Sequence, residues 1–146
     1  MALALEEARA AAARGEVPVG AVVVENGAVI ARAGNRTEEL HDPTAHAELL
    51  AIREACQKLA SPRIPHCDLY VTLEPCAMCA GVISFSRIRR LYFGAYDTKS
   101  GGVEHGGRFF QQTTCHHSPE VYGGRMEQES NEMLRKFFAA LRHGTA

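Results

Sequence analysis

Hydrophobic residues along the chain recur with the spacing of alternating helices and strands. Residues 2–14 hold strong helix formers and end before Gly15, a residue type that often follows a helix. Residues 17–24 are apolar and β-branched, as is typical of a strand, and the Asn26-Gly27 pair after them favours a tight hairpin turn. The same patterns predict later helices at 44–59, 76–85 and 127–142, and later strands at 28–33, 68–73 and 88–94.

The order of these elements predicts an α/β fold. The strand, helix and strand between residues 68 and 94 imply parallel neighbours joined by a right-handed crossover. The whole pattern predicts a three-layer α/β/α sandwich with a mixed central sheet and helices on both faces. Residues 97–125 are rich in glycine, histidine and polar groups and are predicted to form a long functional loop.

The composition fits one domain over residues 1–146. Hydrophobic residues make up 46% and charged residues 23%, which is the balance of an ordinary globular protein. No apolar run reaches the roughly 20 residues that a membrane-spanning helix needs. Glu6 and Glu7 interrupt the apolar start, which argues against a secretory signal, so we expect a cytoplasmic protein without membrane contact.

Charge and cysteine content narrow the partners. The net charge of −1 gives no global basic field, so a nucleic-acid partner would have to bind local basic patches. The number of cysteines is five, and an odd number argues against a complete disulfide framework. In a reducing compartment these thiols are free to bind a metal.

Two short segments carry the candidate chemistry. Cys76 and Cys79 are three residues apart at the start of a predicted helix, where both sulfurs point to one side and the helix dipole favours thiolates. His46 lies near the start of another predicted helix, and one imidazole with two thiolates can hold Zn²⁺. Three protein ligands leave the fourth tetrahedral position for water, which marks a catalytic zinc site.

Glu48 has a role beside such a metal. A carboxylate close to the activated water can accept its proton and pass it to a leaving group. Residues two apart on a regular helix do not share a face, so we expect His46 at a frayed first turn from which both side chains reach one pocket. Cys-x-x-Cys alone would also fit a redox pair or a structural zinc site, but combined with His-x-Glu it is the signature of zinc-dependent deaminases.

Longer stretches of the sequence resemble a known family. The segments GEVPVGAVVV (15–24), HDPTAHAE (41–48), LYVTLEPCAMCAG (69–81) and SRIRRLYFGAYD (86–97) closely resemble the bacterial tRNA-specific adenosine deaminases of the cytidine deaminase superfamily. The resemblance implies a cytidine-deaminase-like fold and a homodimer with one Zn²⁺ per subunit. It also implies a tRNA anticodon stem-loop as substrate, whose wobble adenosine is converted to inosine.

The resemblance assigns roles to individual residues. The three metal ligands and the glutamate described above match the family's zinc ligands and its general acid and base. Asn35 matches an asparagine that hydrogen-bonds the flipped nucleotide, and Asp97 matches an aspartate that contacts a neighbouring ribose hydroxyl. Ala47 lies where the family makes a backbone contact to the base. A simpler interpretation of Asn35 is a turn residue after Gly34, and of Asp97 a strand-end or cap residue. Residues 98–125 depart from the family pattern, so RNA contacts there stay open.

A base inside a stack cannot reach a buried metal, so the target has to be extruded from the anticodon loop. With a net charge of −1, basic side chains must gather on one face to hold its phosphates. The candidates are Arg87, Arg89, Arg90, Lys99, Arg108, Arg135, Lys136 and Arg142.

Two other functions are left open by the sequence. A free nucleobase or nucleoside deaminase, of guanine or cytosine type, would have the same metal site and differ only at the rim of the pocket. A non-catalytic, zinc-stabilised RNA-binding subunit would keep the metal ligands but would not need Glu48.

Two further groups have structural interpretations. Cys115-His116-His117 could suggest a second metal site, but no suitably spaced partner is evident and a packed loop segment is the better interpretation. Phe137 and Phe138 are expected to be core and dimer residues, with one of them able to stack on a nucleotide.

Overall fold

The computed structural model describes residues 1–144 and contains a five-stranded mixed sheet. Its strands are β1 (Gly20–Glu25), β2 (Ala28–Gly34), β3 (Cys67–Leu73), β4 (Arg90–Ala95) and β5 (Glu120–Tyr122). Their order is β2-β1-β3-β4-β5, with β1 antiparallel to β2 and β3, and β4 parallel to β3 and β5. The predicted mixed sheet and the parallel pair around the third helix are confirmed.

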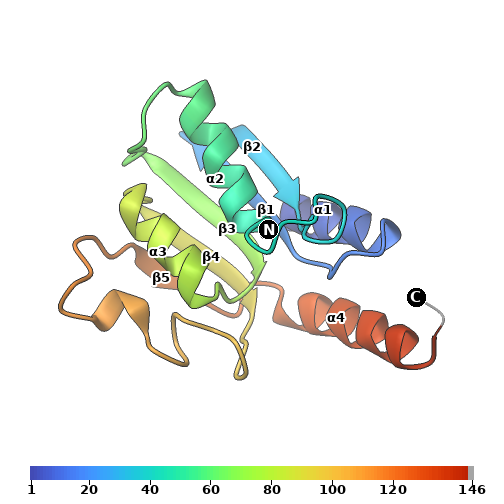
Figure 1. Cartoon of the computed structure of the whole chain (residues 1–146). Coiled ribbons are helices and arrows are strands. Elements are labelled where there is room, and N and C mark those ends of the chain that lie inside the picture. The colour runs from blue at the N-terminus through green and yellow to red at the C-terminus, as the bar shows by residue number, and fades with distance from the viewer. Residues whose placement is uncertain (145–146) are drawn as a thin grey trace.

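Helices cover both faces of this sheet (Figure 1). They are α1 (Ala2–Ala13), α2 (Ala47–Lys58), α3 (Ala77–Phe85), α4 (Glu127–Arg142) and the short 3-10 helix η1 (Phe109–Gln111). α1 and α4 contact each other and pack on one face, while α2 and α3 lie on the other. The α/β/α arrangement predicted from the sequence is therefore present.

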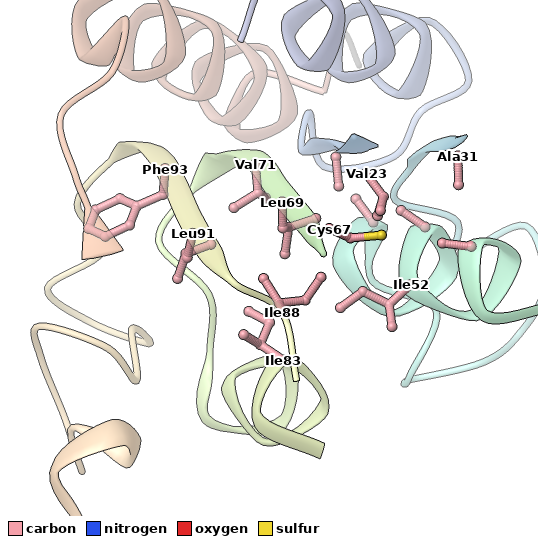
Figure 2. Close-up of a cluster of buried hydrophobic side chains, with 14 of the residues drawn as sticks. Val23, Ala31, Ile52, Cys67, Leu69, Val71, Ile83, Ile88, Leu91 and Phe93 are labelled. Carbon is pink, nitrogen blue, oxygen red and sulfur yellow. The ribbon is translucent and has the colours of Figure 1, made fainter. Parts of the chain in front are cut away.

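The main core lies between the sheet and the α2–α3 layer. Figure 2 shows side chains from β3 and β4 pointing toward those of α2 and α3. The central contacts include Leu69 and Val71 of β3, Phe93 of β4, Ile52 of α2 and Ile83 of α3. This packing positions α2 and α3 against the sheet, and the first turns of both helices carry candidate site residues.

The β1–β2 hairpin follows the sequence prediction. Asn26 and Gly27 have φ values of 50° and 80°, both in the left-handed region that a two-residue hairpin turn requires. The preceding strand begins later than the predicted residue 17. Pro18 has no N–H to donate to a sheet, and the Val19 N–H donates to Val17 O at 2.8 Å in a tight turn, so regular pairing starts at Gly20.

The second helix also begins later than predicted, at Ala47 rather than residue 44. The backbone N–H and the hydroxyl of Thr44 donate to Asp42 Oδ1 at 2.8 and 2.7 Å. The His46 N–H then donates to Thr44 O at 2.7 Å. These bonds form a separate turn before the helix, which is the local competition with helical bonding expected of Asp and Thr.

The prediction that residues 97–125 form a loop throughout is wrong at β5. This strand pairs in parallel with β4, and Tyr122 stacks on Tyr92 with ring centroids 5.1 Å apart. Glu120 Oε2 forms an ion pair with Arg90 Nε at 2.9 Å. Three residues are too few to show an alternating pattern, so cross-strand contacts rather than local sequence determine this edge strand.

No helix among residues 1–144 combines the length and apolar character needed to cross a membrane. The last two residues of the predicted 1–146 domain lie outside the described part of the chain.

The approach of α1 to β1 gives a stability prediction. A Cβ on Gly20 would lie 2.0 Å from Ala4 O and 2.6 Å from Ala8 N, which are both backbone atoms. We expect Gly20→Ala to lower the free energy of unfolding by an amount near the top of the roughly 1–3 kcal/mol range for overpacking. Urea unfolding would measure this, with Gly107→Ala as control because a Cβ there meets nothing within 4 Å. Equal midpoints for the two variants would contradict the prediction.

Candidate active site

The starts of two helices meet at the edge of the core. His46 is the N-cap of α2 and Cys76 is the N-cap of α3, and both have extended backbone conformations. The Cys76 and Cys79 sulfurs each lie 3.6 Å from His46 Nδ1. His46 therefore stands outside the regular helix, as its spacing from Glu48 requires.

These three donors fit a tetrahedral metal ion. With ordinary zinc bond lengths to sulfur and nitrogen, a tetrahedral S–Zn–N angle places the two donor atoms about 3.5 Å apart. The observed separations of 3.6 Å agree with this value, and the three donor atoms all lie within 4.8 Å of one another. Among residues 1–144, no other group of three or more His, Cys, Asp or Glu side chains gathers in this way.

The cluster favours negative charge on one sulfur. A hydrogen bond from the Cys79 thiol, helped by one from His46, lowers the pKa of Cys76 to about 4 against the effect of burial. The hydrogen bond to Cys76 raises the pKa of His46, and the same neighbour together with burial raises the pKa of Cys79. A thiolate at the start of α3 also benefits from the helix dipole, so the site is electrostatically suited to a cation.

Glu48 lies in the first turn of α2 and is 4% exposed. Burial raises the pKa of its carboxyl to about 7, and the nearby Cys76 acts in the same direction. A carboxyl group with such a pKa can both hold and release a proton near neutral pH, which is what general acid–base chemistry requires.

A cavity of about 260 Å³ lies against this cluster. It is lined by His46 and Glu48. It is also lined by the three residues that the family resemblance assigned to substrate contact: Asn35, Ala47 and Asp97. The side-chain oxygen of Asn35 is buried and has no hydrogen-bond partner among the described residues. Ala47 is the first residue of α2, so its amide N–H has no acceptor within the helix. Both groups can bind a ligand in the cavity.

Asp97 is a cap residue, as one of its two interpretations predicted, and it also lies at the cavity. Its Oδ1 accepts hydrogen bonds from the backbone N–H groups of Lys99 and Ser100 at 3.1 and 2.9 Å, so it does cap a turn. It also lines the cavity, where it can contact a ligand. The capping bonds hold the carboxylate in place at the rim.

Sequence reasoning missed two buried carboxylates that hold the walls of the cavity. Glu16 accepts the N–H groups of Glu38 and Glu39 at 3.1 and 2.8 Å, in the loop after β2. Glu74, at the end of β3, accepts N–H groups from the segment 97–105. Their signal is a charged residue directly beside an apolar strand, and both stand inside the motif segments GEVPVG and LEPCAMC.

A larger groove of about 680 Å³ adjoins the cavity and shares Val17, Leu73, Asp97 and Ser100 with it. Its other walls come from the 96–100 segment and from α4. They carry three basic side chains and two exposed aromatic rings: Lys99, Arg135, Arg142, Tyr96 and Phe138.

The expected core position of the two C-terminal phenylalanines is wrong. Phe138 is 40% exposed in the groove and Phe137 is half-buried, because α4 lies on the sheet with a narrow face. Other basic candidates for phosphate contact are held by acidic partners: Arg89 by Asp68 and Arg90 by Glu120. Lys136 pairs with Glu132.

The segment Cys115-His116-His117 packs as a loop. The Cys115 sulfur lies 3.5 Å from Ser84 Oγ, and His117 Nε2 lies 2.8 Å from Ile88 O. These contacts tie the segment to α3 and to Ile88, two residues before β4, in line with the packed-loop interpretation.

Comparison with known proteins places this site in a family. The family model described as MafB19-like deaminase matches residues 1–142. The chain belongs to the MafB19-like deaminases. A tRNA-specific adenosine deaminase of Agrobacterium fabrum is 64% identical to this deaminase over 138 residues, which are 94% of this chain and 91% of that one. A tRNA-specific adenosine deaminase of Bacillus subtilis is 46% identical over 139 residues, or 95% of this chain and 86% of that one.

Solved structures agree with this assignment. A structure from a study of A-to-I editing by tRNA:A34 deaminases has a TM-score of 0.90 at 64% identity, covering 92% of this chain and 97% of that one. A guanine deaminase from Nitrosomonas europaea has a TM-score of 0.83 at 26% identity, covering 94% of this chain and 82% of that one. The fold is therefore cytidine-deaminase-like, and the protein is an enzyme that catalyses deamination.

Proposed function

We propose that this deaminase is a zinc-dependent tRNA adenosine deaminase that converts the wobble adenosine of an anticodon to inosine. The observation that carries the proposal is the joining of the small cavity to the basic groove. The cavity, about 260 Å³, is smaller than the roughly 300–1,000 Å³ of pockets for drug-sized ligands and suits a single base. The groove beside it offers cations and aromatic rings to the rest of an RNA loop. The relatives named above support the same substrate.

His46, Cys76 and Cys79 would hold the zinc ion. When bound, zinc lowers the pKa of water and so supplies a nucleophile at neutral pH. The geometry and charge of the donor set support this assignment, since a cation matches both the separations of the three donors and the thiolate at the start of α3.

The chain's own groups manage the protons of the reaction. Deamination adds water to C6 of adenine and releases ammonia, so one proton must reach the ring nitrogen and another the departing amine. Glu48 can take the first proton from the attacking water and deliver it to the ring nitrogen, and then take the second proton from the hydroxyl added at C6 and deliver it to the departing amine. The Asn35 side chain and the Ala47 N–H would orient the base, and Asp97 would contact a ribose hydroxyl at the rim.

A free-base deaminase is the second candidate, favoured by the likeness to the guanine deaminase of Nitrosomonas europaea. Such an enzyme would need the cavity but not the basic groove. A non-catalytic RNA-binding subunit would need the groove but not a buried carboxyl with a pKa near 7 beside the metal donors. Only the tRNA editing enzyme uses both features.

A second copy of the chain is the partner that we propose for the α2–α3 face. Phe85, at the end of α3, is 74% exposed beside a groove that also includes Ile52, Cys56 and Val82. A twofold axis through such a face lets each Phe85 enter the groove of the other subunit. This arrangement supports a homodimer.

The proposed substrate and the free thiols together support a cytoplasmic location. tRNA is used in that compartment, and all five cysteines are unpaired, as a reducing environment favours.

Zinc content tests the metal assignment. We expect one zinc ion per chain in the purified protein and loss of most of it in Cys79→Ala, because two ligands hold a metal much more weakly than three. Cys56→Ala is the matched control, since Cys56 lies on α2 away from the cluster. Metal analysis after dialysis would measure both. Equal zinc in the two variants would contradict the assignment.

Glu48 and the substrate are tested in one assay. An anticodon stem-loop with adenosine at the wobble position is compared with free adenosine, cytidine, cytosine and guanine. We expect inosine in the stem-loop alone, and a fall in rate of about 10²- to 10⁴-fold in Glu48→Gln with zinc retained. Glu54→Gln, an exposed position on the same helix, should keep the wild-type rate. Ammonia from a free base, with the stem-loop unchanged, would favour the second candidate.

The dimer is tested by the mass of the protein in solution. Wild type should elute with twice the mass of one chain, and Phe85→Asp should shift it to a monomer because a charge cannot be buried at an apolar contact without cost. Leu3→Asp is the control, as an exposed apolar position on α1 at the opposite face of the sheet. Light scattering after gel filtration gives the masses. A wild-type monomer would rule out the dimer.

A further inference from the structure

Glu74 is a fully buried carboxylate that follows β3 and precedes Pro75. Its Oε1 accepts the Asp97 N–H at 3.0 Å and lies 2.8 Å from His105 Nδ1. Its Oε2 accepts the N–H groups of Val103, Glu104 and His105 at 3.2, 2.9 and 3.2 Å. A buried charge is costly unless it is hydrogen-bonded, and these contacts satisfy both oxygens.

All of these donors belong to one segment, residues 97–105. Asp97 and Ser100 line the cavity, and Lys99 lines the basic groove. The segment contains no helix or strand, so its backbone N–H groups have no ladder to join. The carboxylate takes the place of that ladder. Gly101 is part of the same fit, because a Cβ there would lie 2.4 Å from Glu74 Oε2.

We propose that Glu74 is a positioning residue that sets Asp97 against the RNA substrate by fixing the Asp97 backbone. This role rests on the proposed function, because it requires Asp97 to contact the ribose beside the target. Glu74 is among the residues that line the cavity, but its side chain is fully buried and both of its oxygens are occupied by hydrogen bonds, so the carboxylate is not free to act on the base. It acts through the segment that it holds.

Glutamine at this position separates the Asp97 bond from the others. The glutamine side chain has the same shape but only one oxygen. With that oxygen at the Oε2 position, the three amide donors there keep their acceptor. The NH₂ group then faces the Asp97 N–H, so two donors meet without an acceptor. His105 adapts by presenting its unprotonated nitrogen to the NH₂. The substitution therefore loosens Asp97 in particular.

The test is a double-mutant cycle in wobble-adenosine stem-loop deamination by the zinc-loaded protein. Glu74→Gln should raise KM about 10-fold or more with little change in kcat, since a lost hydrogen bond to a charged group costs at least that factor. Asp97→Ala should raise KM as well. If Glu74 acts through Asp97, the double variant is no worse than Asp97→Ala alone.

Glu16→Gln is the matched control. It also weakens a buried carboxylate that holds a cavity wall through two amide N–H groups, but in the loop after β2. Its effect should multiply with that of Asp97→Ala. Multiplicative effects of Glu74→Gln and Asp97→Ala would overturn the proposal.

Hydrogen exchange gives a readout apart from activity. The backbone amide of Asp97 should exchange about 10-fold faster or more in Glu74→Gln, whereas the amides of residues 103–105 keep their acceptor and those of α1 are unchanged. Unchanged exchange at Asp97 would also overturn the proposal. If Glu74→Gln does not fold, His105→Ala takes its place. His105 and the Asp97 N–H share Glu74 Oε1. His105→Ala therefore leaves this oxygen less firmly fixed against Asp97 and should raise KM. His105→Asn keeps an N–H near that position and should return KM toward the wild-type value.

The two proposals fail in different ways. Wild-type protein that leaves the stem-loop unchanged overturns the proposed function and, with it, this role of Glu74. An active wild type whose Glu74 and Asp97 variants are independent overturns the role of Glu74 alone.

Discussion

The parallel pairing of β3 with β4 is the constraint on which the site depends. In a parallel pair both strands end at the same edge, and here Leu73 is paired with Ala95 there. The Glu74 N–H donates to Ala95 O at 2.8 Å and extends the pairing one step further. The residues that follow the two strands, Cys76 on one side and Asp97 on the other, are therefore delivered to the same place. The edge formed by the carboxyl ends of parallel strands is the usual position of ligand sites in α/β sheets.

Around that edge, buried charged side chains bind backbone N–H groups that have no partner in a helix or a sheet. The starts of α2 and α3 supply N–H groups with no acceptor within their helices, and a thiolate and a buried carboxyl lie beside them. The loops on either side have no ladder, and Glu16 and Glu74 act as their acceptors. These loops are thus held by hydrogen bonds to carboxylates, which are stronger than hydrogen bonds between neutral groups.

The sequence predicts the frame of this molecule better than its edges. Helices such as α4, whose predicted bounds 127–142 are those observed, have a long periodic pattern to read. The cluster of His46, Cys76 and Cys79 could be predicted because the spacing of these residues has a chemical meaning of its own. β5 was not predicted because its three residues form a strand only by pairing with β4. The late start of α2 was not predicted because Asp42 and Thr44 form a turn that competes with the helix. The role of Glu74 could not be predicted because the N–H groups that donate to it are 23 to 31 residues away in the chain.

The shallow seat of α4 affects more than its contacts. Of its sixteen residues, all within the described part of the chain, Ser130 alone is buried, and its hydroxyl has no hydrogen-bond partner among residues 1–144. Helices with few fully buried residues belong to the parts of a protein that open at a lower free energy than global unfolding requires. Because Arg135, Phe138 and Arg142 form one wall of the groove, that wall exists only in the docked fraction of molecules. The apparent affinity for RNA is then the intrinsic affinity reduced by that fraction, so changes at the helix–sheet contact tune binding without touching the ligand.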